Sequence, residues 1–227
     1  MILEFGERNS FSSTRDYVYH VLRESIISLK LEPGINISEK DISEKLQVSR
    51  TPVREAFVKL VQDELLEVFP QRGSFVALID LDHVEEARFI REHLELAAIG
   101  LACEMFSPKH MQKLEFNLYM QKRCVEVKDY KKFFELDEEF HETISEGCGK
   151  KRIWTIIQQM NVHLNRVRML SLTENHNWKI ILSQHEDMIE AIKEQDSRKA
   201  ETIIHDHLTL VNNDQGKLKV AYPNYFK

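Results

Sequence analysis

The sequence predicts a mainly α protein: an N-terminal winged helix-turn-helix with a small β-hairpin wing, followed by an antiparallel all-α helical bundle of about six helices. Three observations support this. The 227 residues include only seven glycines and five prolines, too few for the many turns of an all-β fold. Apolar residues recur at three- and four-residue steps over most of the chain, as in amphipathic helices. Two short β-prone runs lie close together, separated by Pro-Gln-Arg-Gly.

The first domain begins with three predicted helices. The first helix carries Val18, Leu22 and Ile26 on one face and ends at a Glu-Pro-Gly turn. The second begins with a sequence similar to a capping box, and the third has a proline in its first turn, where the absent amide would have lacked a partner. The predicted elements are helices over residues 14–30, from Ser38 and from Ser49, and the two strands 66–69 and 74–76 of the wing.

The second domain is almost continuously helical in pattern. Turn-forming sequences interrupt the pattern at five places, which gives about six helices. We expect the domains to span residues 12–78 and 83–214, and we expect residues 216–227, which have no clear pattern, to be a frayed tail. The interruptions lie at residues 107–108, 128–129, 147–149, 173–177 and 195–197.

Charge and cysteine content restrict the possible functions. The net charge of −6 and the pI near 6.0 give no overall basic excess, so any binding to nucleic acid must depend on local residues. Three cysteines without paired spacing predict neither disulfides nor a zinc ribbon and favour the cytoplasm. We also expect a soluble protein with no membrane partner, because no apolar run approaches the roughly 20 residues of a spanning helix and none resembles a signal peptide.

The start of the third helix carries residues suited to reading DNA. Arg50 and Arg54 lie four residues apart on one face, and each can donate two hydrogen bonds to a guanine. The alternative is a merely solvated helix face, because residues 1–76 contain 10 basic and 12 acidic residues and are not a basic domain. The candidate DNA contacts are Lys40, Ser49, Arg50 and Thr51, then Arg54, and finally Arg72 and Gly73 at the tip of the wing.

The motif VSRTPVREA, with LEPG before it and RGSFV after it, resembles the N-terminal domain of the GntR family of bacterial transcription regulators. The resemblance implies DNA contact by Lys40, Arg50, Arg54 and the wing at Gly73. It also implies that a homodimer binds a pseudo-palindromic operator in double-stranded DNA. Glu64 departs from the family pattern, which usually has glycine in the turn after the recognition helix, so the geometry of this turn is an open question.

Four polar residues of the second domain lie on helix faces that are otherwise apolar. Asp137 and His141 are one helical turn apart and can bind one metal ion together. His185 and His207 lie among apolar residues of two other helices, so all four can converge inside a bundle. Three imidazoles and a carboxylate favour zinc, with nickel, manganese or iron as alternatives. Each histidine alone is more often a hydrogen-bonded core residue, and His163 is a further inward-facing histidine that helical phase does not exclude.

Two arginines are candidates for binding an anionic effector. Arg91 falls at the edge of the apolar stripe of its helix, where a guanidinium needs either a structural carboxylate or an anionic ligand as its partner. Glu95, on the next turn, is the obvious structural partner. Arg168 is a weaker candidate, because its helix face is less apolar.

The segments FIREHLELAAIGLA, LDEEFHETI, QHEDMIEAI and HDHL resemble the FCD ligand-binding domain of the FadR-type branch of the same family, over residues 83–211. The resemblance implies that Asp137, His141, His185 and His207 coordinate a metal ion, and that an organic acid completes its coordination shell. About six helices, against the seven often found in this domain, favour the VanR-like subgroup.

We therefore expect a homodimeric transcription regulator, a repressor, whose operator binding is controlled by a small carboxylate bound beside a metal ion, and we expect no catalytic residue. Two alternatives remain open. An Asp/His₃ site could belong to a metalloenzyme that activates water or oxygen, although no separate base or nucleophile is evident. The metal site could also be purely structural, with the effector bound elsewhere.

Overall fold

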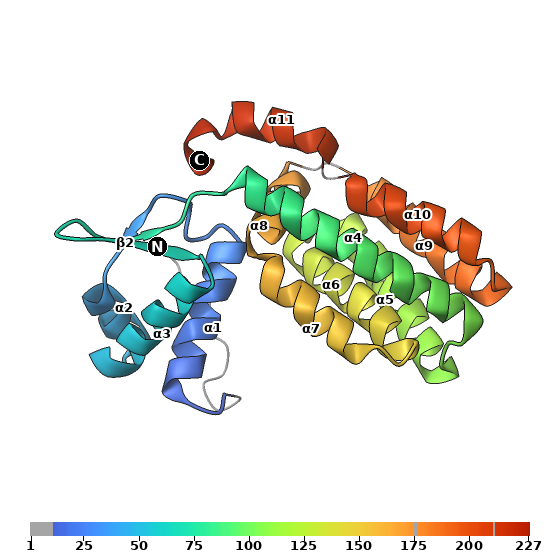
Figure 1. Ribbon diagram of the computed structural model, residues 1–227. Coiled ribbons are helices and arrows are strands. Elements are labelled where there is room, and N and C mark those ends of the chain that lie inside the picture. The colour runs from blue at the N-terminus through green and yellow to red at the C-terminus, as the bar shows by residue number, and fades with distance from the viewer. Residues whose placement is uncertain (1–10, 175–176, 211) are drawn as a thin grey trace. The chain divides into compact units, whose positions relative to one another are not determined.

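The computed structural model describes residues 11–174, 177–210 and 212–227 (Figure 1). The chain divides into two compact units. Met1–Leu81 and Lys219–Lys227 form the first, which we call the winged unit. Asp82–Leu218 form the second, which we call the helical unit.

From residue 11 to Val76, the described part of the winged unit has three α-helices and a three-stranded antiparallel sheet. The sheet has the strand order β1-β3-β2, so that β3 lies in the middle. The short strand β1 was not predicted; it pairs Asn36 with Phe75 and Ile37 with Ser74. The elements are α1 (Thr14–Ile27), β1 (Asn36–Ile37), α2 (Glu39–Leu46), α3 (Arg50–Gln62), β2 (Leu66–Phe69) and β3 (Gly73–Val76).

Local sequence explains where these helices begin. The side chain of Ser13 accepts a hydrogen bond from the Asp16 amide at the start of α1, and Ser38 accepts one from the Asp41 amide at 3.1 Å at the start of α2. The helices pack through side chains that are almost wholly buried. These include Val18, Leu22 and Ile26 of α1, Ile42 of α2, and Val53 and Leu60 of α3.

The helical unit has one more helix than expected. Between Leu81 and Thr209 the described residues form seven helices, because the predicted single helix around His163 is divided at Asn161. The helix count therefore no longer favours the VanR-like subgroup. The helices are α4 (Leu81–Glu104), α5 (Pro108–Val127), α6 (Tyr130–Gly147), α7 (Lys151–Met160), α8 (Val162–Thr173), α9 (Trp178–Glu194) and α10 (Ser197–Thr209).

The core of the helical unit brings α6, α9 and α10 together. Phe140 and Ile144 of α6, Met188 of α9, and Ile204 and Leu208 of α10 belong to one cluster of buried apolar side chains. In Figure 1, α9 and α10 run side by side. The apolar positions that define this core repeat with helical spacing, so residues at the same phase also face inward.

The prediction of a frayed C-terminal tail is wrong. After α10 the chain forms α11 (Asn212–Ala221) and a short 3₁₀ helix, Pro223–Tyr225. Phe226 is buried and pairs in parallel with Ile79, whose amide donates to the Tyr225 carbonyl at 2.7 Å. A few specific contacts with Ile79 hold the tail, although its sequence has no amphipathic pattern. Such contacts cannot be predicted from periodicity.

Among the described residues, no helix is long and apolar enough to cross a membrane.

Candidate metal centre and DNA-binding surface

The structure brings the four predicted metal ligands together in the interior of the helical unit. Asp137 and His141 come from α6, His185 from α9 and His207 from α10, and all four are buried. One ligand atom from each residue lies within 4.8 Å of those from the others. Helical phase therefore correctly predicted that these four side chains face inward and converge, although periodicity contains no direct information on which helices are neighbours.

The Nε2 atom of each imidazole points toward Asp137. The Asp137 Oδ1 atom lies 3.6 Å from His185 Nε2 and 4.0 Å from His207 Nε2, and Oδ2 lies 4.0 Å from His141 Nε2. Three nitrogen lone pairs and a carboxylate oxygen thus face a common point. This donor set is one that binds zinc and other divalent transition metals.

The opposite nitrogen of each imidazole is held by an acceptor oxygen. His141 Nδ1 is hydrogen-bonded to Glu95, and His185 Nδ1 is hydrogen-bonded to Gln121 Oε1 at 2.8 Å. His207 Nδ1 is hydrogen-bonded to Gln184 Oε1 at 3.0 Å. Since these oxygens are acceptors, each Nδ1 carries a proton, and in the neutral imidazole each Nε2 then carries a lone pair. Such outer hydrogen bonds orient metal-binding histidines.

This arrangement fits a cation better than a hydrogen-bonded polar cluster. The Nε2 atoms of His141 and His207 are 3.0 Å apart, and when both rings are neutral and protonated at Nδ1, neither Nε2 has a proton to donate. The buried Nε2 of His185 has no hydrogen-bond partner among the described residues. Two facing lone pairs and an unpaired third are costly in a buried site unless they bind a common positive charge.

The electrostatics of the site keep His185, His207 and Asp137 in the protonation states that bind a metal. Burial lowers the pKa of His185 to about 3, and burial together with His185 and His141 lowers the pKa of His207 well below its usual value. Burial alone would raise the pKa of Asp137, but Arg168 and the histidines outweigh it, so this pKa lies far below its usual range. Neutral imidazoles and an ionised carboxylate are the states that coordinate metals.

A cavity of about 50 Å³ adjoins the cluster. Asp137 and His207 lie in its wall, together with Arg88, Arg91 and Arg168. The remainder of the wall is partly apolar, so a small molecule with an anionic group and a short hydrocarbon part fits its chemistry. The apolar residues include Leu164, Leu172, Ile181 and Leu208.

Arg91 has the structural carboxylate partner that was one of its two predicted alternatives, and it keeps one donor atom without a partner among the described residues. Its Nε atom donates to Glu95 Oε1 at 2.5 Å, and its Nη1 atom lies 3.9 Å from Glu138 Oε1. Its Nη2 atom is buried without a hydrogen-bond partner among the described residues. Arg168 is bonded to Asp137 and Glu138, so it neutralises a cluster residue and borders the cavity as well.

His163, the other inward-facing histidine expected from helical phase, lies outside the four-residue cluster. His163 is buried, but its ring packs against His83 at 5.2 Å between centroids, and it does not belong to the Asp137 cluster. The residues that hold the Nδ1 atoms were not predicted from the sequence. Gln121 could have been found, since it lies four residues after Asn117 on the buried face of α5 and its amide donates to Asn117 Oδ1 at 2.7 Å.

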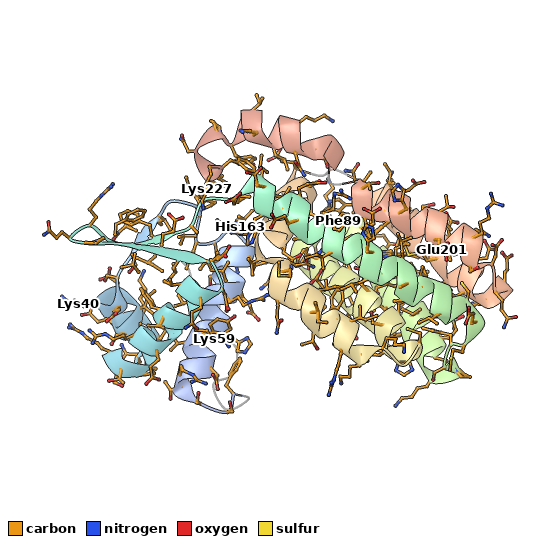
Figure 2. The ribbon with its side chains drawn as sticks, viewed as in Figure 1. Lys40, Lys59, Phe89, His163, Glu201 and Lys227 are labelled. Carbon is orange, nitrogen blue, oxygen red and sulfur yellow. The ribbon has the colours of Figure 1, made fainter. Side chains whose placement is uncertain are left out.

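All seven predicted DNA contacts are exposed on the winged unit. They lie at the start of α2, the start of α3 and the tip of the wing; Figure 2 labels Lys40 on α2. Ser49 makes no side-chain capping hydrogen bond at the start of α3, so its hydroxyl is available to a phosphate. Arg54 Nε lies 3.4 Å from Glu39, and Lys40 Nζ lies 3.9 Å from Glu44. Exposed pairs of this kind are weak and exchange readily for phosphate.

The two units correspond to two known domains that together define a class of DNA-binding regulators. Residues 14–76 match the family of bacterial regulatory proteins named gntR, and residues 86–210 match the FCD domain. The chain therefore belongs to the GntR family, in its branch with an FCD domain, and is a DNA-binding transcription regulator.

Relatives match over nearly the whole chain. An uncharacterised HTH-type transcriptional regulator of an unstable DNA locus in Streptomyces ambofaciens is 34% identical over 97% of this chain and 92% of its own length. The HTH-type transcriptional repressor RspR of Escherichia coli K12 is 31% identical over 96% of both chains. The solved structure of E. coli McbR/YncC has a TM-score of 0.77 at 22% identity, covering 95% of this chain and all of that one, and supports the fold.

Proposed function

We propose that this regulator is a homodimeric repressor whose operator binding is controlled by a small carboxylate bound beside a divalent transition metal, zinc in the first instance. The observation that carries the proposal is the shared wall of the cavity. Two of the four cluster residues, Asp137 and His207, border the same space as three arginines. A metal bound by the cluster supplies a positive charge to which a carboxylate can coordinate.

The chain's own residues explain the preference for a carboxylate. The unpartnered Nη2 atom of Arg91 can donate to one oxygen of the ligand, and Arg168 adds positive charge at the same wall. The carboxylates next to these arginines are neutralised by ion pairs, Glu95 with Arg91 and Glu138 with Arg168. These carboxylates therefore repel a bound anion less than unpaired ones would.

On the DNA side, we propose that Arg50 and Arg54 read bases in the major groove. Ser49, Thr51 and Lys40 contact phosphates, and the wing at Arg72 and Gly73 enters the adjacent minor groove, so these residues set both register and specificity. A homodimer presents two such helices to half-sites about one turn apart. The effector can change DNA affinity only by as much as it prefers one arrangement of the two winged units over another.

The test uses protein purified without chelators. We expect elemental analysis to find about one divalent transition metal ion per chain. A panel of short carboxylic acids is then screened for a change in affinity for a DNA duplex selected from a random-sequence pool, with and without metal. A saturating panel that never changes duplex affinity would refute control by a carboxylate.

The same experiment separates the alternatives. If metal removal lowers stability but leaves a carboxylate response intact, the metal is structural. If metal-loaded protein consumes one of the acids and His185→Ala abolishes the turnover, the protein is a metalloenzyme as well.

A further inference from the structure

The tip of the wing is unusually aromatic for an exposed hairpin. Phe69 at the end of β2 is 39% exposed, and Phe75 of β3 is partly buried. Phe69 pairs with Gly73 in the antiparallel register, so Phe75, two residues further along β3, is its diagonal neighbour on the same face. Their rings meet edge to face, with centroids 5.7 Å apart and an angle of 73° between their planes.

The guanidinium of Arg72 lies against this aromatic pair. Its central carbon is 5.5 Å from the centroid of Phe69 and 6.0 Å from that of Phe75. A guanidinium within about 6 Å of an aromatic ring centroid is attracted to the ring face. The two rings therefore restrict the orientations of a side chain that would otherwise move freely at the tip of a hairpin.

The backbone beneath Arg72 is fixed as well. Pro70 and Gln71, which has a φ of 62°, form the centre of a turn closed by the Arg72 amide and the Phe69 carbonyl at 3.1 Å. From β1, the side-chain amide of Asn36 donates to the Arg72 carbonyl at 3.4 Å. Gly73 has a φ of 105°, which residues with a side chain rarely adopt, and a Cβ atom there would also lie 2.9 Å from the Asn36 amide nitrogen, so this position favours glycine.

We propose that Phe69 and Phe75 are positioning residues for DNA binding: they form a platform that holds the Arg72 guanidinium ready to enter the minor groove. The inference rests on the proposed contact of Arg72 with DNA. The benefit is a lower entropic cost of binding, because a long side chain that is already oriented loses less freedom in the complex. It also explains why apolar rings are kept at an exposed site.

A double-mutant cycle tests the platform with full-length protein and a duplex selected from a random-sequence pool. Arg72→Ala should weaken binding and reduce the slope of log affinity against log salt by about 1. Phe69→Leu, which keeps the apolar bulk, should weaken binding about two- to fivefold when Arg72 is present and not at all in the Arg72→Ala background. Phe69→Tyr keeps the ring and should bind as the wild-type protein does.

Val68→Ala is the matched control, because Val68 precedes Phe69 on β2, is 58% exposed and faces the other side of the sheet. It should leave the affinity for DNA unchanged.

If Phe69→Leu weakens binding equally with and without Arg72, the ring itself touches DNA and the platform is rejected. If Arg72→Ala changes neither affinity nor salt slope, Arg72 does not contact DNA and the proposed contact fails together with the platform. Unaltered hydrogen exchange in α3 verifies that each variant is folded.

Discussion

Glu64 occupies the turn after α3, where the family usually has glycine, and the turn still forms. It follows the C-cap of α3 and has a φ of 57°, in the left-handed region that favours glycine. Its amide donates to the Val61 carbonyl at 3.1 Å, and the amide of Leu65 donates to the Leu60 carbonyl at 2.8 Å. These two bonds form a Schellman motif, so the turn geometry left open by the sequence is retained.

Glu64→Gly should therefore stabilise the winged unit by about 1 kcal/mol, because it removes the strain of a side chain in the left-handed region. Glu55→Gly is the matched control: Glu55 is exposed in the middle of α3, where the same substitution should destabilise by about 1 kcal/mol. The measurement is the free energy of opening from amide hydrogen exchange in α1 and α3. A loss of protection in Glu64→Gly would contradict the strain argument.

Glu95 has a larger role than the structural ion pair predicted for it. Burial alone would raise its pKa, but Arg91 and His141 outweigh burial and lower it to about 2, so the carboxylate is ionised when it holds His141 Nδ1. Glu95→Gln keeps an acceptor oxygen but removes the charge that makes the imidazole a better ligand.

Glu95→Gln should weaken zinc binding roughly 10- to 100-fold, the usual effect of losing an outer partner of a metal ligand. Competition with a chromophoric chelator measures this affinity. Glu85→Gln is the control, since Glu85 is an exposed residue of the same helix that pairs with Arg88. Equal zinc affinity in both variants would show that the charge of Glu95 does not act on the site.

At the scale of elements, the sequence predicted the helices that end at glycine, proline or strong turn sequences. It did not predict the division between α7 and α8. Asn161, with a φ of −82° and a ψ of 8°, ends α7 while its carbonyl accepts from the Asn165 amide at 2.7 Å. Neither glycine nor proline marks this position, so the helical pattern continues across a break that tertiary packing imposes.

The four-residue cluster could be predicted because helical phase places each polar side chain on a buried face. The oxygens around it could not be assigned, since that requires knowing which helices are neighbours. Gln121 of α5 contacts His185 of α9 across 64 residues, and Glu95 of α4 contacts His141 of α6 across 46. Periodicity within one helix contains no information on such pairs.

The four proposed ligands come from three helices, so a bound metal should stabilise the helical unit as a whole. Saturating zinc should raise its free energy of unfolding by about 4 kcal/mol when free zinc is a thousandfold above the dissociation constant. Tryptophan fluorescence in urea reports this unit selectively, because both tryptophans, Trp154 and Trp178, lie in it.

His207→Ala should abolish most of this stabilisation by zinc. His205→Ala is the matched control two residues earlier on α10, where the exposed His205 pairs with Glu92 at 2.8 Å and has no place in the cluster. If zinc stabilises His207→Ala as much as the wild-type protein, His207 is not a ligand.

At the scale of the whole chain, net charge was a poor guide to function. The overall charge is −6, yet the exposed cations at the start of α3 and at the wing belong to a DNA-binding regulator. Arrangement rather than total charge decides which surface meets phosphate. The acidic remainder of the winged unit adds no general attraction to DNA, so we expect specific affinity to depend on the two matched half-sites that the proposed homodimer would contact.

The C-terminal segment joins the two units a second time. Asp214 of α11 accepts from Ser171 at 2.5 Å and from Asn177 at 2.6 Å, both of which border the cavity of the helical unit. Further along the same segment, the Lys227 amide donates to the Ile79 carbonyl at 3.0 Å in the winged unit. Figure 2 labels Lys227, whose Nζ lies 3.4 Å from both Glu67 and Asp80.

Ending the chain after Ala221 should destabilise the winged unit by about 1–3 kcal/mol. The truncation exposes the apolar surface that Phe226 covers and removes two backbone hydrogen bonds of Ile79. Part of this loss is offset because the conformational entropy of ordering the tail is no longer spent. Faster exchange of the Ile79 amide and of the β3 amides is the expected signal. Lys227→Ala, which removes only exposed ion pairs, should change exchange little. Exchange in the truncated chain that equals the wild-type rate at Ile79 would mean that the tail does not hold the winged unit in solution.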